Sequence, residues 1–304
     1  MRQRPVVVGL GEILWDVFPD GARFGGAPTN FACSSAGIGR EASDVYMVSA
    51  VGTDELGDKA IDALVEHGVH VDAVTRNSRP TGKVHVKLDK SGHASYEFEA
   101  DAAWDRLQWS NHLEQLAKRT DIVCFGTLGQ RSETSLAAVR RFVTSTPSNA
   151  LRILDINIRR PFIQDEVIVD SLKLANVLKL NDEELPELKR LFQLTGSPLS
   201  MLHQLLDRFS FQIVALTRGS NGAMLVRGNE VSEEPGVHVD LVDTVGAGDA
   251  FTAVLAIGVH QGRDLQWINH KACEVAAFVC SQSGATPKIP DRLLLSPKNS
   301  PPMS

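Results

Sequence analysis

Cysteine is scarce in this sequence, which has four in 304 residues. None of them belongs to a C-x-x-C pair, so the chain carries neither a zinc-knuckle nor a dithiol redox motif. The expectation is a set of buried free thiols in a reducing cytoplasm. The four are Cys33, Cys124, Cys273 and Cys280.

Long apolar runs and an excess of positive charge are missing as well. No run approaches the ~18 residues that a membrane span requires. Glu12 and Asp16 interrupt the apolar start of the chain too early for a signal peptide. The 31 basic and 37 acidic residues give a net charge of −6, which disfavours a protein that binds the backbone of DNA or RNA. We therefore expect a cytoplasmic protein with no membrane or nucleic-acid partner.

Short apolar runs alternate with helical patterns along most of the chain. Such runs suit strands covered on both faces, and their alternation with helices predicts an α/β fold with a doubly wound, mostly parallel sheet. A helix is expected over residues 54–67 and ends at Gly68, with His67 and His70 exposed near its end. The expected strands are residues 6–10, 45–51, 122–125, 153–157, 177–180, 213–217 and 223–227.

Two segments break this alternation and predict a small separate sheet. Residues 14–24 contain a tight-turn signal at residues 19–21 between two short arms. Residues 83–99 alternate apolar and polar side chains around a hairpin signal at residues 89–92. Within a single domain of residues 1–304, we expect an inserted β-sheet lid from about residues 13–24 and 81–101. Trp104 and Trp109 are expected to pack at the base of this lid.

The strongest local signal is the run DTVGAGDAF at residues 243–251. It follows an extended stretch at residues 237–242 and opens an apolar helical pattern. Glycines at a helix N-terminus let backbone N–H groups converge on an anion, which the helix dipole also favours. Asp249 would lie in the first turn of this helix, where an Asp more commonly serves only to cap the helix N-terminus. A helix cap, however, requires neither the two glycines nor the preceding Asp243. We interpret residues 243–249 as an anion-binding loop, the anion loop.

Neither of the two common nucleotide-binding loops is present. Phe251 stands where the dinucleotide fingerprint has its third glycine. Gly82-Lys83 is followed by Val84, which excludes a Walker A loop there. The anion loop therefore belongs to neither of these two classes of phosphate-binding loop.

Two other glycine clusters could hold ligands. In the first, Gly25 and Gly26 let a ligand approach the backbone closely. Asn30, together with the earlier Asp16, can form hydrogen bonds with sugar hydroxyls. An ordinary turn before a helix also explains this cluster. The sequence TRGSNG at residues 217–222 follows an expected strand, at the edge where open α/β sheets bind ligands. A simple hairpin turn is the alternative for that cluster.

Together these motifs resemble those of the ribokinase-like (PfkB) carbohydrate kinases. The resemblance runs from residues 9–12 to Gly284-Ala285, and its two signature regions are residues 25–30 and 243–251. The sequences GEILWD and GGAPTN, with the pattern Asp155-x-Asn157-x-Arg159, look most like those of fructokinases. A ribokinase-like fold and an ATP-dependent carbohydrate kinase, a phosphotransferase to an alcohol group, are what the resemblance implies.

The resemblance also implies how phosphoryl transfer would occur. Asp249 would accept the proton of the sugar hydroxyl, while the backbone amides of Gly246, Ala247 and Gly248 would stabilise the transferred phosphoryl group. Glu184 would organise Mg²⁺ through water. Asp243 and the Val245 carbonyl match part of a site for a monovalent cation such as K⁺.

Contacts to ATP and to the sugar are implied in the same way. The ATP contacts are Asn181, Thr217, Arg218, Gly219, Ser220, Asn221, Gly222 and Gly248. The sugar contacts are Asp16, Gly25, Gly26, Asn30 and Arg159.

D-fructose, phosphorylated at its 6-hydroxyl, is the expected substrate. Ribose, 2-keto-3-deoxygluconate and nucleosides stay open, because a few lid side chains can reset the choice of sugar. A non-catalytic sugar-binding protein is a further alternative, disfavoured because Asp249 and the glycines of the anion loop are present. Exposed β edges in the small sheet predict a homodimer formed through the lid.

Overall fold

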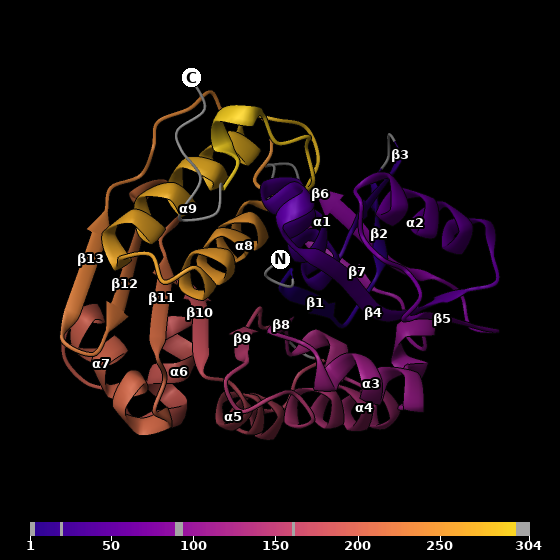
Figure 1. Ribbon diagram of the computed structural model, residues 1–304, viewed down its shortest axis with the longest axis horizontal. Coiled ribbons are helices and arrows are strands. Elements are labelled where there is room, and N and C mark those ends of the chain that lie inside the picture. Colours follow the sequence, from indigo (N-terminus) through magenta and orange to yellow (C-terminus); the bar gives the residue numbers. More distant parts are fainter. Residues whose placement is uncertain (1–3, 19–20, 89–93, 160–161, 296–304) are drawn as a thin grey trace.

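A nine-stranded sheet forms the centre of the protein in a computed structural model that describes residues 4–18, 21–88, 94–159 and 162–295 (Figure 1). Its order is β13-β12-β11-β10-β9-β8-β1-β4-β5, and all pairs are parallel except those that β12 makes with β11 and β13. The expected mostly parallel sheet is confirmed. Its strands are β1 (Val6–Leu10), β4 (Asp44–Gly52), β5 (Val74–Asn77), β8 (Ile122–Phe125), β9 (Leu151–Asp155), β10 (Val177–Asn181), β11 (Ile213–Thr217), β12 (Ala223–Arg227) and β13 (Glu230–Glu234).

Helices cover both faces of this sheet, which explains why its strands are apolar on both sides. In β1, Val7 packs in one hydrophobic core and its neighbours Val6 and Val8 pack in the other, because successive side chains point to opposite faces. One core is closed by α1 (Ala27–Gly39), α2 (Glu55–Glu66), α8 (Ala247–His260) and α9 (Leu265–Cys280). The other is closed by α3 (Asn111–Lys118), α4 (Glu133–Thr144), α5 (Asp165–Leu174), α6 (Leu185–Phe192) and α7 (Pro198–Phe209).

A separate four-stranded sheet, the small sheet, lies beside α1 and α2 (Figure 1). Its order is β3-β2-β6-β7, formed by β2 (Leu14–Phe18), β3 (Gly21–Gly25), β6 (Gly82–Leu88) and β7 (Ala94–Phe98). These strands come from the two segments that broke the alternation of the sequence, although β3 ends at Gly25 and β6 begins at Gly82, each one residue outside the expected bounds. The predicted turns involve residues 19–20 and 89–92, which lie outside the described residues. Trp104 packs beneath this sheet as expected, with its Nε1 2.6 Å from the position that a Cβ on Gly82 would take.

Residues 237–242, the stretch before the anion loop, pair with no strand in the described chain, and their apolar side chains Val237 and Leu241 are 45% and 67% exposed. Two expectations about single side chains are wrong. Trp109 packs against the core of the main sheet instead of the lid. His67 is half-buried rather than exposed, because both of its ring nitrogens contact carbonyl oxygens. His70 is exposed as expected.

The four cysteines are all free. Cys33, Cys124 and Cys273 are buried as expected, while Cys280 is half-buried. Among the described residues, no helix combines the length and apolar character needed to cross a membrane.

Candidate active site

The anion loop leads directly into α8 at the carboxyl edge of the main sheet. Gly246 caps this helix with φ +80°, a conformation that favours glycine, and an added Cβ would lie 2.2 Å from the Ala285 carbonyl oxygen. Among the hydrogen bonds of the described residues, none uses the N–H groups of Gly246, Gly248 or Asp249, whereas the Ala247 N–H donates to the Thr244 oxygen at 3.4 Å. Unpaired N–H groups at a helix N-terminus are donors for an anion.

Asp249 lies in the first turn of α8, as the sequence predicts. Asn30 of α1 donates its Nδ2–H to Asp249 Oδ2 at 2.8 Å, which joins residues 219 positions apart. Burial and the charge of Asp155 raise the pKa of Asp249 to about 7, although its hydrogen bond to Asn30 and the charge of Lys179 oppose the shift. The side chain keeps part of its surface open, so a substrate hydroxyl can reach a carboxylate that changes protonation near neutral pH.

A buried ion pair supports the anion loop from behind. Lys179 of β10 donates to Asp155 Oδ1 at 3.0 Å, and Thr252 of α8 donates to Asp155 Oδ2 at 3.0 Å. Lys179 Nζ also lies 3.1 Å from the position of a Cβ on Gly248. Sequence reasoning missed the role of Lys179, although a single lysine inside the apolar strand VLKLN was a visible signal. A charge in a fully covered strand needs a partner, and Asp155 is that partner.

Glu184 and Asn181 lock the end of β10 to the loop after β9. Glu184 Oε1 accepts from the Ile158 N–H at 2.9 Å, and Oε2 accepts from the Asn181 N–H at 2.8 Å. Asn181 Oδ1 in turn accepts from the Glu184 N–H at 2.9 Å. Burial raises the pKa of Glu184, while the charge of Lys179 lowers it. Both side chains are therefore held rigidly at the edge where the resemblance places ATP and Mg²⁺.

Two buried oxygen atoms near Asp249 have no hydrogen-bond partner in the described structure. They are Glu12 Oε2 and Asn30 Oδ1, on residues that are 2% and 4% exposed. Burial, with a smaller contribution from the charge of Asp249, raises the pKa of Glu12 to about 7. Gly26 allows this packing, because its φ is +111° and a Cβ there would lie 2.7 Å from the Glu12 carbonyl oxygen. Glu12 is a second residue whose role the sequence reasoning missed.

The small sheet brings Asp16 and Arg23 to the same place. Burial raises the pKa of Asp16 to about 6, against the charge of Arg159, and Asp243 of the anion loop adds to the increase. Asp16 Oδ2 lies 3.0 Å from the position of a Cβ on Gly25. Arg23 forms an ion pair with Asp243 at 3.6 Å, so the small sheet contacts the anion loop directly. The predicted sugar contacts thus converge from β2, α1 and the loop after β9.

The remaining predicted residues flank this centre. Thr217 ends β11 beside Asn181, its parallel partner on β10, and residues 218–222 form the connection to the antiparallel β12. This places the segment at the carboxyl edge of the sheet, although its backbone is also a hairpin connection. Asp243 Oδ1 accepts from the Val245 N–H at 3.0 Å, and Oδ2 accepts from the Gly284 N–H at 3.3 Å.

The acidic side chains do not form a ready metal site by themselves. In the part of the chain that the structure describes, no group of three or more His, Cys, Asp or Glu side chains has the arrangement of a metal centre. Glu184, fixed by two backbone N–H groups, suits an outer contact to Mg²⁺, which keeps several of its waters and takes further oxygens from substrate phosphates.

A family model described as pfkB family carbohydrate kinase matches residues 20–292. The chain belongs to the pfkB carbohydrate kinase family. A fructokinase from Klebsiella pneumoniae is 30% identical over 269 residues, which cover 82% of this chain and 83% of that protein. This relative is similar across most of its length, which supports sugar phosphorylation as the shared chemistry.

Solved structures of the same fold contain the expected nucleotide. A fructokinase from Xylella fastidiosa with bound ATP has a TM-score of 0.81 and 23% identity, over 95% of this pfkB chain and 96% of that chain. A structure from E. coli that contains ATP and Mg²⁺ has a TM-score of 0.81 and 22% identity, over 93% of this chain and 95% of that one. At these identities, the two structures confirm the ribokinase-like fold.

Proposed function

We propose that this pfkB kinase transfers the γ-phosphoryl group of ATP to the 6-hydroxyl of D-fructose. The observation that carries the proposal is the position of Asp249. Burial raises the pKa of its carboxyl group to about 7, and the group lies within one helical turn of the N–H groups of Gly246 and Gly248, which can donate hydrogen bonds to the oxygens of a phosphoryl group. A proton acceptor beside an anion hole is the pair of parts that phosphoryl transfer to an alcohol requires.

Asp249 accepts the proton of the attacking hydroxyl. Asn30 holds Asp249 Oδ2 by a 2.8 Å hydrogen bond, which leaves Oδ1 for the substrate. The N–H groups of Gly246 and Gly248, with a smaller contribution from Ala247, stabilise the charge that develops on the transferred phosphoryl group. Lys179 adds positive charge beneath Gly248 while it neutralises Asp155.

The nucleotide is held at the carboxyl edge of the sheet. Asn181 and residues 217–222 contact ATP there, next to Gly248 of the anion loop. Mg²⁺, when bound, neutralises charge on the phosphate oxygens, and Glu184 contacts it through water. Asp243 and the Val245 carbonyl contribute to a site for K⁺, behind the anion loop.

Acceptor groups dominate the sugar side of the site. Glu12 Oε2 and Asn30 Oδ1 are buried without donors, and Asp16 adds a second carboxylate. A ligand that satisfies these oxygens must supply hydroxyl donors, whereas the carboxylate of a sugar acid would add repulsion. This argument favours a neutral polyhydroxylated sugar such as fructose over 2-keto-3-deoxygluconate, with Arg159 as a contact to the sugar or its new phosphate.

The small sheet acts as the lid of this site and as a dimer surface. Its edge strands are β3 and β7, and the first residues of β3 are exposed. A single four-stranded layer gains stability from a partner surface, which a second copy of the chain supplies. Light scattering at micromolar concentration should show a dimer, and a monomer would remove this part of the proposal.

A coupled ADP-release screen tests the substrate. We expect the highest kcat/KM for fructose, lower values for ribose and nucleosides, and the lowest for 2-keto-3-deoxygluconate. ADP release that is fastest with the sugar acid would contradict the acceptor-rich interpretation of the site. No sugar-dependent ADP release from the whole panel would favour a non-catalytic sugar-binding protein.

A further inference from the structure

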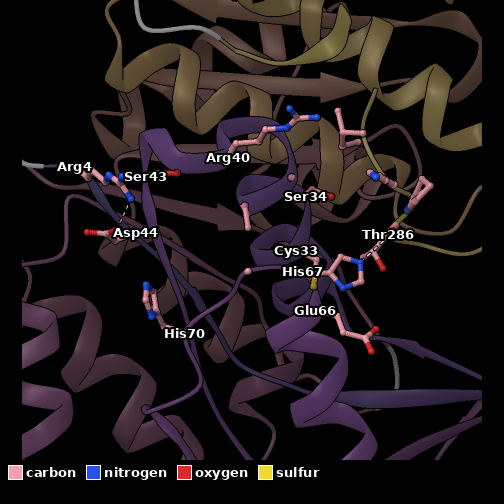
Figure 2. A pocket seen from close by; sticks show the side chains of 16 residues that line it. Arg4, Cys33, Ser34, Arg40, Ser43, Asp44, Glu66, His67, His70 and Thr286 are labelled. Atoms are coloured by element: carbon pink, nitrogen blue, oxygen red, sulfur yellow. Dashed lines mark hydrogen bonds and ion pairs between the residues drawn. The ribbon is translucent and has the colours of Figure 1, made fainter. Parts of the chain in front are cut away.

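A cavity of about 670 Å³ lies apart from the active site, between α1, the C-terminal end of α2, the start of β4 and residues 286–289. It shares no residue with the catalytic or substrate contacts described above. Figure 2 shows side chains from these elements around it, with His67 directed toward Thr286 and Arg4 beside Asp44. The volume falls in the range of ~300–1,000 Å³ that small-molecule sites occupy.

Cationic side chains outnumber anionic ones in this cavity. Arg4, Arg40 and Lys288 line it, against Asp44 and Glu66. Both arginines form ion pairs, Arg4 with Asp44 at 3.8 Å and Arg40 with Asp291 at 2.5 Å, where the side chains of Arg40 and Asp291 are 49% and 75% exposed. Exposed ion pairs contribute little free energy, so a phosphate can compete for these guanidinium groups. Lys288 is exposed and makes no hydrogen bond or ion pair with the described residues. Guanidinium and ammonium groups in this state are available to a phosphate.

The segment that closes the cavity also supports the anion loop. Residues 286–289 line the cavity, while Ala285 packs against Gly246 so closely that a Cβ on Gly246 would lie 2.2 Å from its carbonyl oxygen. The Gly284 N–H donates to Asp243 Oδ2 at 3.3 Å. One continuous stretch of backbone therefore touches the cavity on one side and the anion hole on the other.

His67 ties this stretch to α2. Its Nδ1 lies 2.8 Å from the Ala63 oxygen and its Nε2 lies 3.0 Å from the Thr286 oxygen. A carbonyl oxygen only accepts hydrogen bonds, so both contacts are hydrogen bonds only when both ring nitrogens carry a proton. His67 thus links the C-terminal end of α2 to residue 286 of the segment that lines the cavity.

We propose that this cavity binds a phosphorylated sugar, which regulates the kinase from a second site. The phosphate contacts Arg40 and Lys288, and the sugar occupies the remaining volume. The bound ligand fixes residues 286–289, which line the cavity, and so steadies the anion loop through Ala285, which packs against Gly246. The expected result is tighter ATP binding. The regulatory half of this proposal rests on the proposed kinase function, while the binding half does not.

Calorimetric titration with glucose 6-phosphate tests the binding half without turnover. The wild type should bind it more tightly than inorganic phosphate, and glucose should not compete. Arg40→Gln/Lys288→Gln should weaken the binding at least ~10-fold, consistent with the loss of two charge-assisted contacts. The matched control, Lys189→Gln/Arg190→Gln on the exposed face of α6, removes the same charge and should leave binding unchanged.

Saturating fructose distinguishes the cavity from the active site. Binding of glucose 6-phosphate that is unaffected by saturating fructose and is lost in Arg40→Gln/Lys288→Gln supports the cavity. Binding that is unchanged in Arg40→Gln/Lys288→Gln, or no binding by the wild type, overturns the proposal.

Steady-state kinetics with fructose test the regulatory half. Glucose 6-phosphate should lower the KM for ATP about 5-fold or more in the wild type, the lower end of common allosteric couplings. The Arg40→Gln/Lys288→Gln variant should keep its basal kcat and lose this response. His67→Gln should still bind glucose 6-phosphate but show no change in KM. A wild-type KM that does not respond to bound glucose 6-phosphate contradicts the coupling, whereas a protein that binds it but phosphorylates no sugar contradicts the proposed function alone.

Discussion

Two sets of buried side-chain oxygens lie near Asp249, and they differ in how their hydrogen bonds are satisfied. Behind the anion loop, Asp155 accepts from both Lys179 and Thr252. On the sugar side, Glu12 Oε2 and Asn30 Oδ1 have no donor among the described residues. A satisfied buried group stabilises the fold, and an unsatisfied one is a cost that a ligand can remove. The first set supports the anion loop from behind, and in the proposed function the second set binds the sugar.

The largest expected effect concerns Asp249 itself. Asp249→Asn keeps the shape of the side chain but cannot accept the hydroxyl proton, so kcat should fall ~10²–10⁴-fold. ATP affinity should stay the same or increase, because a negative charge near the phosphates is lost. Turnover within about threefold of wild type would instead favour the capping role, in which Asn serves as well as Asp.

Breaking the satisfied group should damage stability more than binding. Lys179→Met leaves Asp155 buried and unpaired, which should lower the free energy of unfolding by ~3–5 kcal/mol in denaturant titrations. The control Lys173→Met removes a lysine that is 62% exposed and should change it by less than ~1 kcal/mol. The double variant Lys179→Met/Asp155→Leu should recover much of the lost stability. Equal losses of stability in Lys179→Met and in the control Lys173→Met would contradict the supporting role of the buried ion pair.

Changing the unsatisfied group should affect the sugar and spare the nucleotide. Glu12→Gln replaces one free acceptor by an amide that also donates, so the KM for fructose should rise ~10-fold, the equivalent of one charged hydrogen bond. The KM for ATP should stay within about twofold. The control Glu55→Gln changes a carboxylate that is 81% exposed and should alter neither value. A rise in the KM for ATP without a rise in the KM for fructose would contradict a contact between Glu12 and the sugar.

A smaller effect should appear in the thermal stability of Asp249→Asn. The pKa of Asp249 is raised to about 7 in the folded protein, so the folded state binds more protons than the unfolded state and loses stability as pH rises toward 7. Removing the charge should therefore raise Tm, by about 2–4 °C for each kcal/mol recovered. The gain should be larger at pH 8 than at pH 5, and the opposite order would contradict the raised pKa.

The parts of this site that the sequence predicts are those whose signal is local. The anion loop is one continuous run, and Asp249 follows from its place at the start of α8. The contact between Asn30 and Asp249 spans 219 positions, so spacing alone does not reveal it. The orphaned oxygen of Glu12 likewise depends on packing between segments far apart in the sequence, because a Cβ on Gly129 would lie 3.4 Å from Glu12 Oε2.

For the fold as well, the sequence predicts the elements with a strong local signal and misses those that depend on their neighbours. The apolar strands of the main sheet are evident in the sequence, but β5 and β13 are short and polar, with the sequences VTRN and EVSEE. Residues 237–242 alternate apolar and polar side chains at their start but pair with no strand in the described chain, because strand pairing depends on the neighbours that the fold provides.

The pH dependence of kcat/KM for fructose tests the central claim most directly. If Asp249 accepts the proton, kcat/KM should reach a plateau above the pKa of about 7 and fall about tenfold per pH unit below it. Because burial also raises the pKa of Glu12 to about 7, the comparison is made in the Glu12→Gln background. Glu12→Gln should keep this decrease, and the residual activity of Glu12→Gln/Asp249→Asn should lack it. A wild-type kcat/KM that stays constant from about pH 5.5 to 8.5, or a decrease that persists in Glu12→Gln/Asp249→Asn, would contradict the role of Asp249 as the proton acceptor.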